Sequence, residues 1–237
     1  VLRTDTQWTE GGRARHRVSE RVARERAAAA LAKVGIPSPH ERLLAYPHQF
    51  SGGMRQRVAI AIALLNEPDV IIADEPTTAL DVTVQGQILA QMQSLCRASG
   101  TALIWISHDL SVVAGLADTV SVMYAGRIVE QGPVAEVLDR PRHPYTRGLI
   151  ASAPSRNPRG RPLQQIPGMT PSLLALPQGC AFQARCASAD VVCRNEPPLV
   201  ALDGRRLRCI HPAPLPSPCA IANWHHGHGH PVARTAR

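Results

Sequence analysis

The sequence predicts an α/β protein, because short apolar segments alternate with longer helical segments in its central part. The runs "VIIAD" (70–74) and "TALIWIS" (101–107) are bounded by turn residues, which is typical of buried strands in a parallel sheet. The stretch between them, residues 82–98, is expected to be a helix. A strand, a helix and a second strand in this order form one layered unit.

Two helices are expected before the first strand. The Arg- and Ala-rich stretch from Gly12 to Val34 has the composition of a helix, with Ser19 as its cap and Gly35 as its stop. A second helix is expected over residues 54–66, directly after two glycines and before the breaker "NEPD". These helices define the first predicted domain, a helical subdomain over residues 1–66.

The second predicted domain, residues 67–153, is the remainder of the α/β core. It ends with a short helix at 111–116 and with the hairpin "TVSVMYAGRIVEQG", which turns at Ala125–Gly126. The composition then becomes rich in proline. The third predicted domain is a C-terminal extension with a cysteine cluster over residues 154–211, and a disordered tail rich in proline and histidine is expected over residues 212–237.

Composition limits the partners and compartments to be considered. The 237 residues carry a formal charge of +8 with a sequence pI of about 9.8, which indicates an anionic partner such as a nucleotide, a nucleic acid or a lipid surface. Arginines near the two ends account equally well for this excess. No apolar run approaches the ~20 residues of a membrane span and no secretion signal begins the sequence, so a cytosolic protein is expected.

Residues Ser51–Gly53 precede the second helix and suit an anion. The first N–H groups of a helix have no intrahelical partner, and the helix dipole favours negative charge beside them. Glycine also lets the backbone approach a phosphate closely. Taken alone, however, this tripeptide is more typical of an ordinary capped helix start.

Ionisable residues follow both predicted strands. Asp74 and Glu75 end the first strand, and His108 follows the second. Ligands of open α/β sheets bind at the carboxyl ends of the strands. There, one carboxylate can hold Mg²⁺, the other can polarise a water, and a histidine can contact a γ-phosphate or the attacking water. Each motif alone also fits solvated turn residues, but their joint occurrence around "TTALD" favours a nucleotide site.

In this order, the motifs resemble those of the nucleotide-binding subunits of ABC transporters. "SGGMRQR" is similar to the signature motif, although Phe50 and Met54 replace the Leu and Gln of its most frequent form, L-S-G-G-Q. "VIIADE" is similar to Walker B, "TALD" to the D-loop and "ISHDL" to the H-loop. "AYPHQFSGGMRQR" and "GRIVEQGPVAEVLDRPRHPYTRGLIASAP" resemble the dipeptide/oligopeptide importer branch, and the likeness covers about residues 13–211.

The resemblance implies a partial P-loop NTPase fold of the ABC ATPase type and a role for the residues after each strand. Asp74 would hold Mg²⁺ through water, and Glu75 would be the general base for attack of water on the γ-phosphate of ATP. His108 would sense or position that phosphate. The implied reaction is ATP hydrolysis coupled to transport.

The signature residues would contact the ATP that a second ATP-binding subunit holds. They are Ser51, Gly52, Gly53 and Gln56. Asp81 would carry communication across that dimer. The resemblance further implies membrane permease subunits as partners, an external substrate-binding protein as an indirect partner, no nucleic acid, and a peripheral location on the cytoplasmic side of the inner membrane.

Two motifs of this family are missing from the sequence. The resemblance implies a phosphate loop (Walker A), G-x-x-x-x-G-K-S/T, and a glutamine-bearing Q-loop before the helical subdomain, and the 237 residues contain neither. The only lysine, Lys33, lies in "ALAKVGIP", without the glycines needed to wrap β- and γ-phosphates. We therefore expect an N-terminally truncated chain that binds ATP weakly and hydrolyses it negligibly on its own.

Four of the six cysteines are crowded together, as Cys180, Cys186, Cys193 and Cys209. Without a secretion signal, such a cluster favours metal or redox chemistry over disulfides, and a metal would stabilise a small proline-rich segment. Four thiolates suit zinc or an iron–sulfur cluster, and the wide C-x5-C-x6-C-x15-C spacing favours the cluster. The segment also resembles the C-terminal extension of peptide-importer ATPases, of which some hold a 4Fe–4S cluster; reduced or disulfide-linked thiols remain an alternative.

The remaining cysteines and histidines give weaker signals. Cys96 lies in a predicted helix and is expected to be a core thiol, and Cys219 has no evident partner. The run "WHHGHGHP" (224–231) offers closely spaced imidazoles to a transition metal, but a solvated disordered end accounts for it better.

The leading expectation is an ATPase subunit of an importer for di- or oligopeptides. A DNA-associated ABC-type ATPase shares the signature and Walker B motifs, but the importer-like stretches and the missing coiled-coil or zinc-finger insertions speak against it. The missing phosphate loop favours a further alternative, a nonenzymatic metal-binding remnant. The transported molecule is not identified, because related systems also carry nickel, glycosides or antimicrobial peptides and specificity resides in other subunits.

Overall fold

The computed structural model describes residues 19–78, 80–154, 157, 160 and 162–215. The chain divides into two compact units, residues 1–112 and 113–237, which are described separately. The sequence-based domain boundaries after residues 66, 153 and 211 stay predictions.

The first unit begins with helices α2 (Glu20–Lys33) and α3 (Pro39–Leu43), a 3-10 turn η1 (Pro47–Gln49), and helix α4 (Gly52–Leu64). Ser19 occupies the N-cap position of α2 without a side-chain hydrogen bond, and the expected start of this helix at Gly12 lies outside the described residues. Gly35 follows α2 with a φ of +70°, as expected of a glycine that stops a helix. Helix α4 begins at Gly52, two residues before its predicted start, because Ser51 is its cap.

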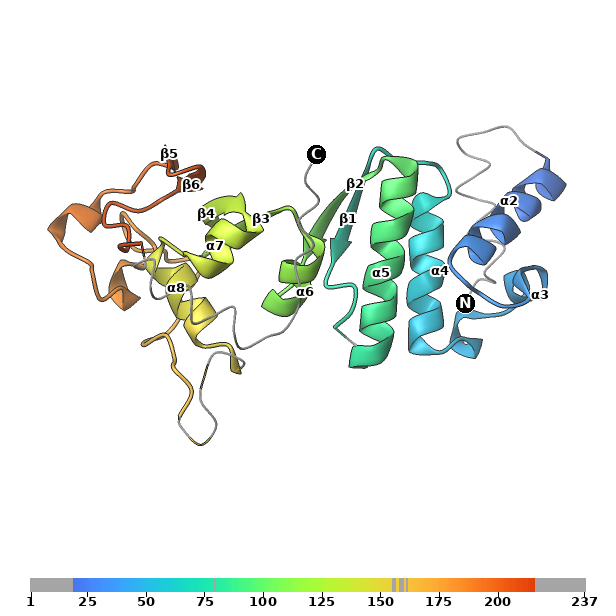
Figure 1. Cartoon of the computed structure of the whole chain (residues 1–237), viewed down its shortest axis with the longest axis horizontal. Helices are drawn as coiled ribbons and strands as arrows, with labels where there is room; N and C mark the ends of the chain where they lie inside the picture. Colours follow the sequence, from blue (N-terminus) through green and yellow to red (C-terminus); the bar gives the residue numbers. More distant parts are fainter. Residues whose placement is uncertain (1–18, 79, 155–156, 158–159, 161, 216–237) are drawn as a thin grey trace, which may run out of the picture. The chain divides into compact units, whose positions relative to one another are not determined.

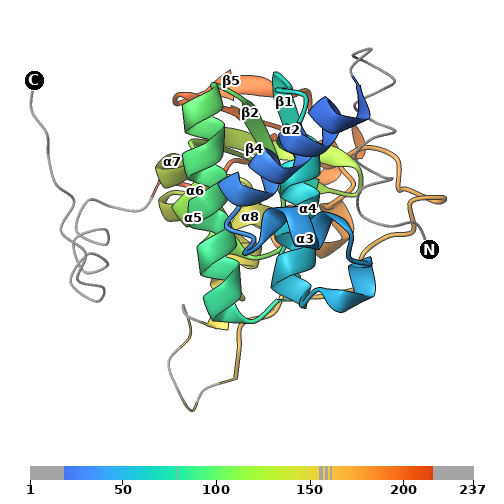
Figure 2. The same ribbon diagram turned by 90° about the vertical axis from the view of Figure 1, so that its right-hand side faces the viewer.

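A parallel pair of strands forms the centre of the first unit. Strand β1 (Val70–Asp74) pairs with β2 (Ala102–Ile106), and helix α5 (Val82–Ser99) connects them. The predicted strand–helix–strand order is thereby confirmed. Figures 1 and 2 show α4 and α5 side by side next to these strands. Helix α6 (Leu110–Leu116) follows β2 and contains the boundary between the two units.

The two faces of the strand pair differ in burial. Ile71 and the half-buried Leu103 pack into the core formed with the helices, which also contains Cys96, the expected core thiol. On the other face, Ile72 is 66% exposed and Ile104 is 51% exposed. Alternation of this kind follows from the two-residue period of a strand. An open apolar face is typical of a sheet that receives another layer of structure.

The second unit is built on a four-stranded antiparallel sheet in the order β3-β4-β6-β5. The predicted hairpin is confirmed: β3 (Thr119–Tyr124) and β4 (Arg127–Pro133) are joined at Ala125 and Gly126, which both have positive φ values, of 49° and 77°. Strands β5 (Val200–Leu202) and β6 (Arg205–Leu207) come from the predicted cysteine-bearing extension. They were not predicted, because three residues are too few to show a periodic pattern.

The second unit also contains helical segments: α7 (Val134–Asp139), which packs against β3 and β4, α8 (Pro144–Ala151) and the 3-10 turns η3 (Gln183–Arg185) and η4 (Val191–Arg194). The proline-rich stretch before η3 is tied down by Arg185. Its guanidinium donates hydrogen bonds to the carbonyl oxygens of Ile166 at 3.2 Å and Pro167 at 2.8 Å.

A buried ion pair fastens β6 to the rest of the second unit. The side chains of Glu130 and Arg205 are 0% and 1% exposed, and Nη1 of Arg205 lies 3.0 Å from Oε1 of Glu130. The same guanidinium donates to the carbonyl oxygens of Glu136 and Arg140, at 2.7 Å each. Two backbone N–H groups, at residues 142–143, donate to the carboxylate at 2.9 Å. Both charged groups are therefore hydrogen-bonded, as a buried pair requires, although the Nε atom of Arg205 is buried without a hydrogen-bond partner.

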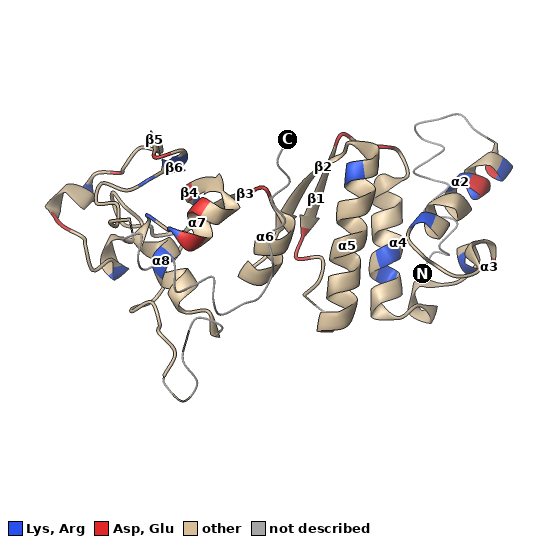
Figure 3. Ribbon diagram, in the orientation of Figure 1, with Lys and Arg blue, Asp and Glu red and all other residues tan. Residues whose placement is uncertain are grey.

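Lysine and arginine are spread over several helices of the first unit, including α2, α3, α4 and α5 (Figure 3). Among the described residues, no helix combines the length and the hydropathy that crossing a bilayer demands.

Candidate functional site

The signature segment forms the start of α4. The Ser51 hydroxyl oxygen accepts a hydrogen bond from the Met54 N–H group at 3.3 Å, and Gly52 and Gly53 make the first turn of the helix. A Cβ atom added to Gly53 would lie 2.7 Å from Cγ1 of Val84. Glycine at this position therefore lets α4 pack closely against the start of α5 while its first N–H groups stay free for an anion.

The D-loop residue Asp81 caps the neighbouring helix. Its carboxylate accepts a hydrogen bond from the Val84 N–H group at 2.9 Å. Arg57 of α4 donates to Gln87 of α5 at 3.1 Å. Gln56 is half-buried on α4. Signature and D-loop residues, about thirty positions apart in the sequence, are thus brought together at the N-terminal ends of two packed helices.

Glu75, the predicted general base, is held by three neighbours directly after β1. Its N–H group donates to the Ile106 carbonyl oxygen at 3.0 Å, which extends the strand pairing by one bond. Its carboxylate accepts a hydrogen bond from the Thr78 hydroxyl at 2.6 Å, and its other oxygen lies 2.8 Å from Nδ1 of His108. Glu75 has a φ of +47°, and strained backbone of this kind is concentrated at functional sites.

The contact between Glu75 and His108 favours the charged form of both groups. Hydrogen bonds from Thr78, and then from His108, lower the pKa of Glu75. The Glu75 carboxylate raises the pKa of His108. The histidine side chain is 74% exposed and the glutamate side chain 38% exposed, so solvent screens the pair and it orients the carboxylate more than it stabilises the fold.

Asp74, the predicted Mg²⁺ ligand, ends β1 opposite Ile106 of β2. It is exposed, and within the described part of the chain its carboxylate has no hydrogen-bond or ion-pair partner. The Asp74 carboxylate is thus available to a cation such as Mg²⁺, which binds proteins through one or two carboxylates. Sequence reasoning missed Thr78, although a hydroxyl three residues after Glu75 in "DEPTT" was a visible signal.

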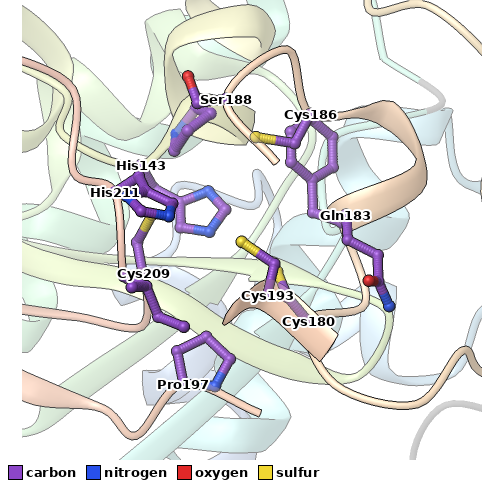
Figure 4. Close-up of a pocket in the computed structure, with 12 residues that line it drawn as sticks. His143, Cys180, Gln183, Cys186, Ser188, Cys193, Pro197, Cys209 and His211 are labelled. Atoms are coloured by element: carbon purple, nitrogen blue, oxygen red, sulfur yellow. The ribbon is translucent and has the colours of Figure 1, made fainter. Parts of the chain in front are cut away.

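The four predicted metal ligands of the second unit line one cavity. Cys180, Cys186, Cys193 and Cys209 border a space of about 10 Å³, together with His211 (Figure 4). That volume is close to the space one water molecule occupies. In this side-chain arrangement the cavity therefore fits a single ion, and a four-iron cluster would need the thiols to move apart.

Backbone N–H groups near three of these sulfurs lower the pKa of the thiols. These N–H groups belong to Phe182 and Gln183 for Cys180, to Ser188 for Cys186 and to His211 for Cys209. N–H groups aimed at sulfur stabilise thiolates and are common at metal–thiolate sites. Without a metal, burial has the larger effect and raises the pKa of all three thiols, that of Cys209 to about 11.

Gly179 allows the first two cysteine-bearing segments to meet. The Cys180 N–H group donates to the Cys193 carbonyl oxygen at 2.9 Å. Gly179 has a φ of +86°, and a Cβ atom there would lie 2.4 Å from the carbonyl carbon of Arg194. Any other residue would therefore push the two segments apart.

Two further polar residues near the cavity escaped the sequence-based prediction. Asp190 and His211 lie beside Cys193, and one ligand atom from each of the three side chains lies within 4.8 Å of the other two. The signal was present in the sequence, because both residues fall inside the cysteine-bearing segment. Cys219 and the histidine run 224–231 lie outside the described residues.

Comparisons with known proteins agree with these motifs. Residues 5–78 match the family model "ABC transporter", and residues 129–193 match "Oligopeptide/dipeptide transporter, C-terminal region". The oligopeptide transport ATP-binding protein OppD of Salmonella typhimurium is 50% identical over 196 residues, 82% of this chain and 58% of that protein. The chain belongs to the ABC transporter ATP-binding family. The family predicted from the order of the motifs is thereby confirmed.

Other members of this ABC family show the same extent of similarity. The dipeptide transport ATP-binding protein DppD of Bacillus subtilis is 52% identical over 180 residues, which are 76% of this chain and 54% of that protein. The probable D,D-dipeptide transport ATP-binding protein DdpD of Escherichia coli is 50% identical over 192 residues, 81% of this chain and 58% of that protein. The chain spans little more than half the length of these relatives.

Proposed function

We propose that this chain is an ATP-binding and ATP-hydrolysing subunit of an ABC importer for di- or oligopeptides. The observation that carries the proposal is the carboxylate of Glu75, which Thr78 and His108 hold at the end of a strand beside the free carboxylate of Asp74. Its relatives with "oligopeptide transport" and "dipeptide transport" in their names support the substrate class.

In the proposed reaction, Glu75 accepts a proton from a water molecule that attacks the γ-phosphorus of ATP. The bond from that phosphorus to the β–γ bridging oxygen breaks, and ADP and phosphate leave. Mg²⁺, held on the side of Asp74, would supply charge neutralisation at the phosphates when bound. His108 keeps the Glu75 carboxylate oriented and offers its ring to the γ-phosphate.

These 237 residues contain no phosphate loop, so the groups that bind the β- and γ-phosphates would be supplied by another segment. The open apolar face of β1 and β2, with Ile72 and Ile104 exposed, supports this, because it offers a surface to the layer that carries the loop. Ser51–Gly53, at the free end of α4, would contact the ATP held by a second ABC subunit.

Phosphate release is the measurement that tests this function. The chain alone is expected to give no turnover above background, whereas the chain joined to the phosphate-loop segment of a relative is expected to hydrolyse ATP. Glu75→Gln should then lower turnover by roughly 10²–10⁴-fold, because it removes the proton acceptor without changing the shape of the side chain. Glu41→Gln, on the exposed side of α3, is the matched control. Equal turnover of the two variants would contradict the proposal.

The transport role implies further partners: membrane permease subunits, a second ABC ATPase and, indirectly, an external substrate-binding protein. The chain would sit peripherally on the cytoplasmic side of the inner membrane. If the chain joined to the phosphate-loop segment of a relative restores uptake of a labelled tripeptide in bacteria lacking their own oligopeptide ATP-binding subunit, that result would support this role. A complemented strain in which Glu75→Gln transports as well as the unmodified chain would argue against it.

For the cysteine cavity we propose metal binding, with an iron–sulfur cluster on Cys180, Cys186, Cys193 and Cys209 as the form that the family resemblance implies. The four thiols that border one cavity are a suitable donor set for this chemistry, and they would have to move apart to hold the cluster, because the cavity measures only about 10 Å³. Anaerobic purification followed by iron and sulfide analysis and visible spectroscopy tests it. Zinc without iron in that preparation would exclude the cluster.

A further inference from the structure

Asp190, Cys193 and His211 bring an oxygen, a sulfur and a nitrogen atom to one place in the second unit. These ligand atoms lie within 4.8 Å of one another, and in the described part of the chain no other group of three such side chains does so. The other three cysteines share the cavity but do not complete such a group with Cys193. Carboxylate, thiolate and imidazole are each ligands that zinc takes in proteins.

Asp190 is fixed in orientation before any ion arrives. It is the N-cap of η4, and its Oδ1 atom accepts hydrogen bonds from the N–H groups of Val192 at 2.9 Å and Cys193 at 3.4 Å. Its second oxygen, Oδ2, is therefore directed away from the backbone and lies 2.8 Å from Nε2 of His211.

His211 is held on the opposite side of the group by the segment that follows β6. The Arg208 N–H group donates to the Val129 carbonyl oxygen at 2.9 Å, and the Ala213 N–H group donates to the Arg142 carbonyl oxygen at 2.8 Å. Both flanks of His211 are thus anchored to the body of the second unit, so its backbone does not have to be ordered when an ion binds.

The Nε2 atom of His211 is buried without a hydrogen-bond partner. It is inaccessible to solvent, and although Oδ2 of Asp190 is only 2.8 Å away, the direction of that contact does not satisfy hydrogen-bond geometry. A buried nitrogen without a hydrogen-bond partner lowers the stability of the fold. A cation bound by both Oδ2 and Nε2 would give the two atoms a shared partner after a small separation of the side chains.

Charge and space also suit one small divalent ion. Cys193 is buried, at 8% exposed, and both it and His211 border the cavity of about 10 Å³ (Figure 4). A carboxylate and a thiolate together neutralise a doubly charged ion, and a neutral imidazole adds no charge. The Asp190 and His211 side chains are 45% and 39% exposed, which leaves one side of the group open to water.

From this geometry we propose that Asp190, Cys193 and His211 bind one zinc-like divalent ion when no cluster occupies the four thiols, with a fourth position open to solvent. Binding replaces the thiol proton of Cys193, which passes to solvent, by the metal–sulfur bond. Because Cys193 belongs to both ligand sets, the single ion and the cluster are alternative occupants of the same segment. The proposal is independent of ATP hydrolysis in the first unit.

The test uses the full chain, purified with a chelator under reducing conditions and shown by elemental analysis to hold neither iron nor zinc. Cobalt(II) is the probe, since its visible bands report tetrahedral geometry and its thiolate charge-transfer band reports the number of sulfur ligands. One equivalent is expected to bind, with the intensity of a single thiolate. Competition with zinc then gives the zinc affinity.

Conservative variants separate the two ligand sets. Asp190→Asn keeps the helix cap. Asp190→Asn and His211→Gln are each expected to weaken cobalt binding at least about tenfold. Cys186→Ser lies in the same cavity outside the proposed group and should change the affinity by no more than about twofold. Unchanged circular dichroism in all three variants excludes misfolding as the cause.

Two results would overturn the proposal. One is an absence of stoichiometric cobalt binding by the unmodified chain, which would leave Asp190 and His211 as a simple ion pair. The other is a change of ligands: if Cys186→Ser weakens cobalt binding as much as the Asp190 and His211 variants do, or if His211→Gln binds cobalt as tightly as the unmodified chain, the ion belongs to the four thiols instead.

Discussion

Glu130 offers the sharpest test of what holds the second unit together. Its fully buried carboxylate accepts one hydrogen bond from the Arg205 guanidinium and two from the backbone N–H groups of residues 142–143. Glu130→Gln keeps the shape of the side chain but removes its charge. The amide NH₂ group would then face a hydrogen-bond donor, and the buried guanidinium of Arg205 would keep only the partly exposed Glu136 as a counter-ion.

The expected loss is about 3–5 kcal/mol, the range for removing one partner of a buried ion pair. Since domains are stable by roughly 5–15 kcal/mol, this is a large share of the total. At a typical urea dependence, it lowers the unfolding midpoint by roughly 2 M. Hydrogen exchange followed by mass spectrometry is the assay, because peptides from β4 and β6 report on the second unit while peptides from α4 and α5 serve as an internal reference.

Variants of more exposed glutamates test whether the loss of stability comes from burial of the charge. Glu196→Gln removes an ion pair with Arg127 and Arg208 whose glutamate side chain is 43% exposed, and should cost less than about 1 kcal/mol. Glu136→Gln, at 31% exposed, should fall between the two. The reasoning is refuted if Glu130→Gln costs no more than Glu196→Gln, or if protection is lost equally in α4 and β4.

Two other predictions concern the same unit. Burial lowers the pKa of His143 to about 4, from 6.5 in the unfolded chain, so the unfolded chain binds more protons between these values. The stabilisation from a neutral His143 is therefore complete above pH 6.5 and falls by up to about 3 kcal/mol as the pH drops toward 4, and urea midpoints at several pH values should show a slope that is smaller in His143→Gln. Gly179→Ala should lower the melting temperature more than Gly126→Ala: both residues have positive φ, but a Cβ atom would meet Arg194 at 2.4 Å only in the first case and open space in the second. The conformational cost alone is about 1–2 kcal/mol, so equal losses would show that the backbone contact adds nothing.

The positions of the candidate site residues at strand and helix ends were predictable because their signals are local. A short apolar run followed by Asp74 and Glu75, and a second run followed by His108, identified both strand ends, and parallel pairing brought them together. Ser51 and Asp81 were visible as residues that precede helices, and each caps its helix through its side chain. What these patterns did not reveal was the conformation of Glu75, because a positive φ outside glycine is imposed by the surrounding contacts.

The sequence by itself determined the α/β order of elements, the hairpin, the family and the candidate ligands, since caps, turns, strand periods and motif order all act over a few neighbouring residues. Only the tertiary structure decided which distant side chains meet. Glu75 reaches His108 across 33 positions and Glu130 reaches Arg205 across 75, and Asp190 joins His211 beside Cys193. Such contacts depend on how packed segments place their side chains in space, and neither hydrophobic period nor composition carries that information.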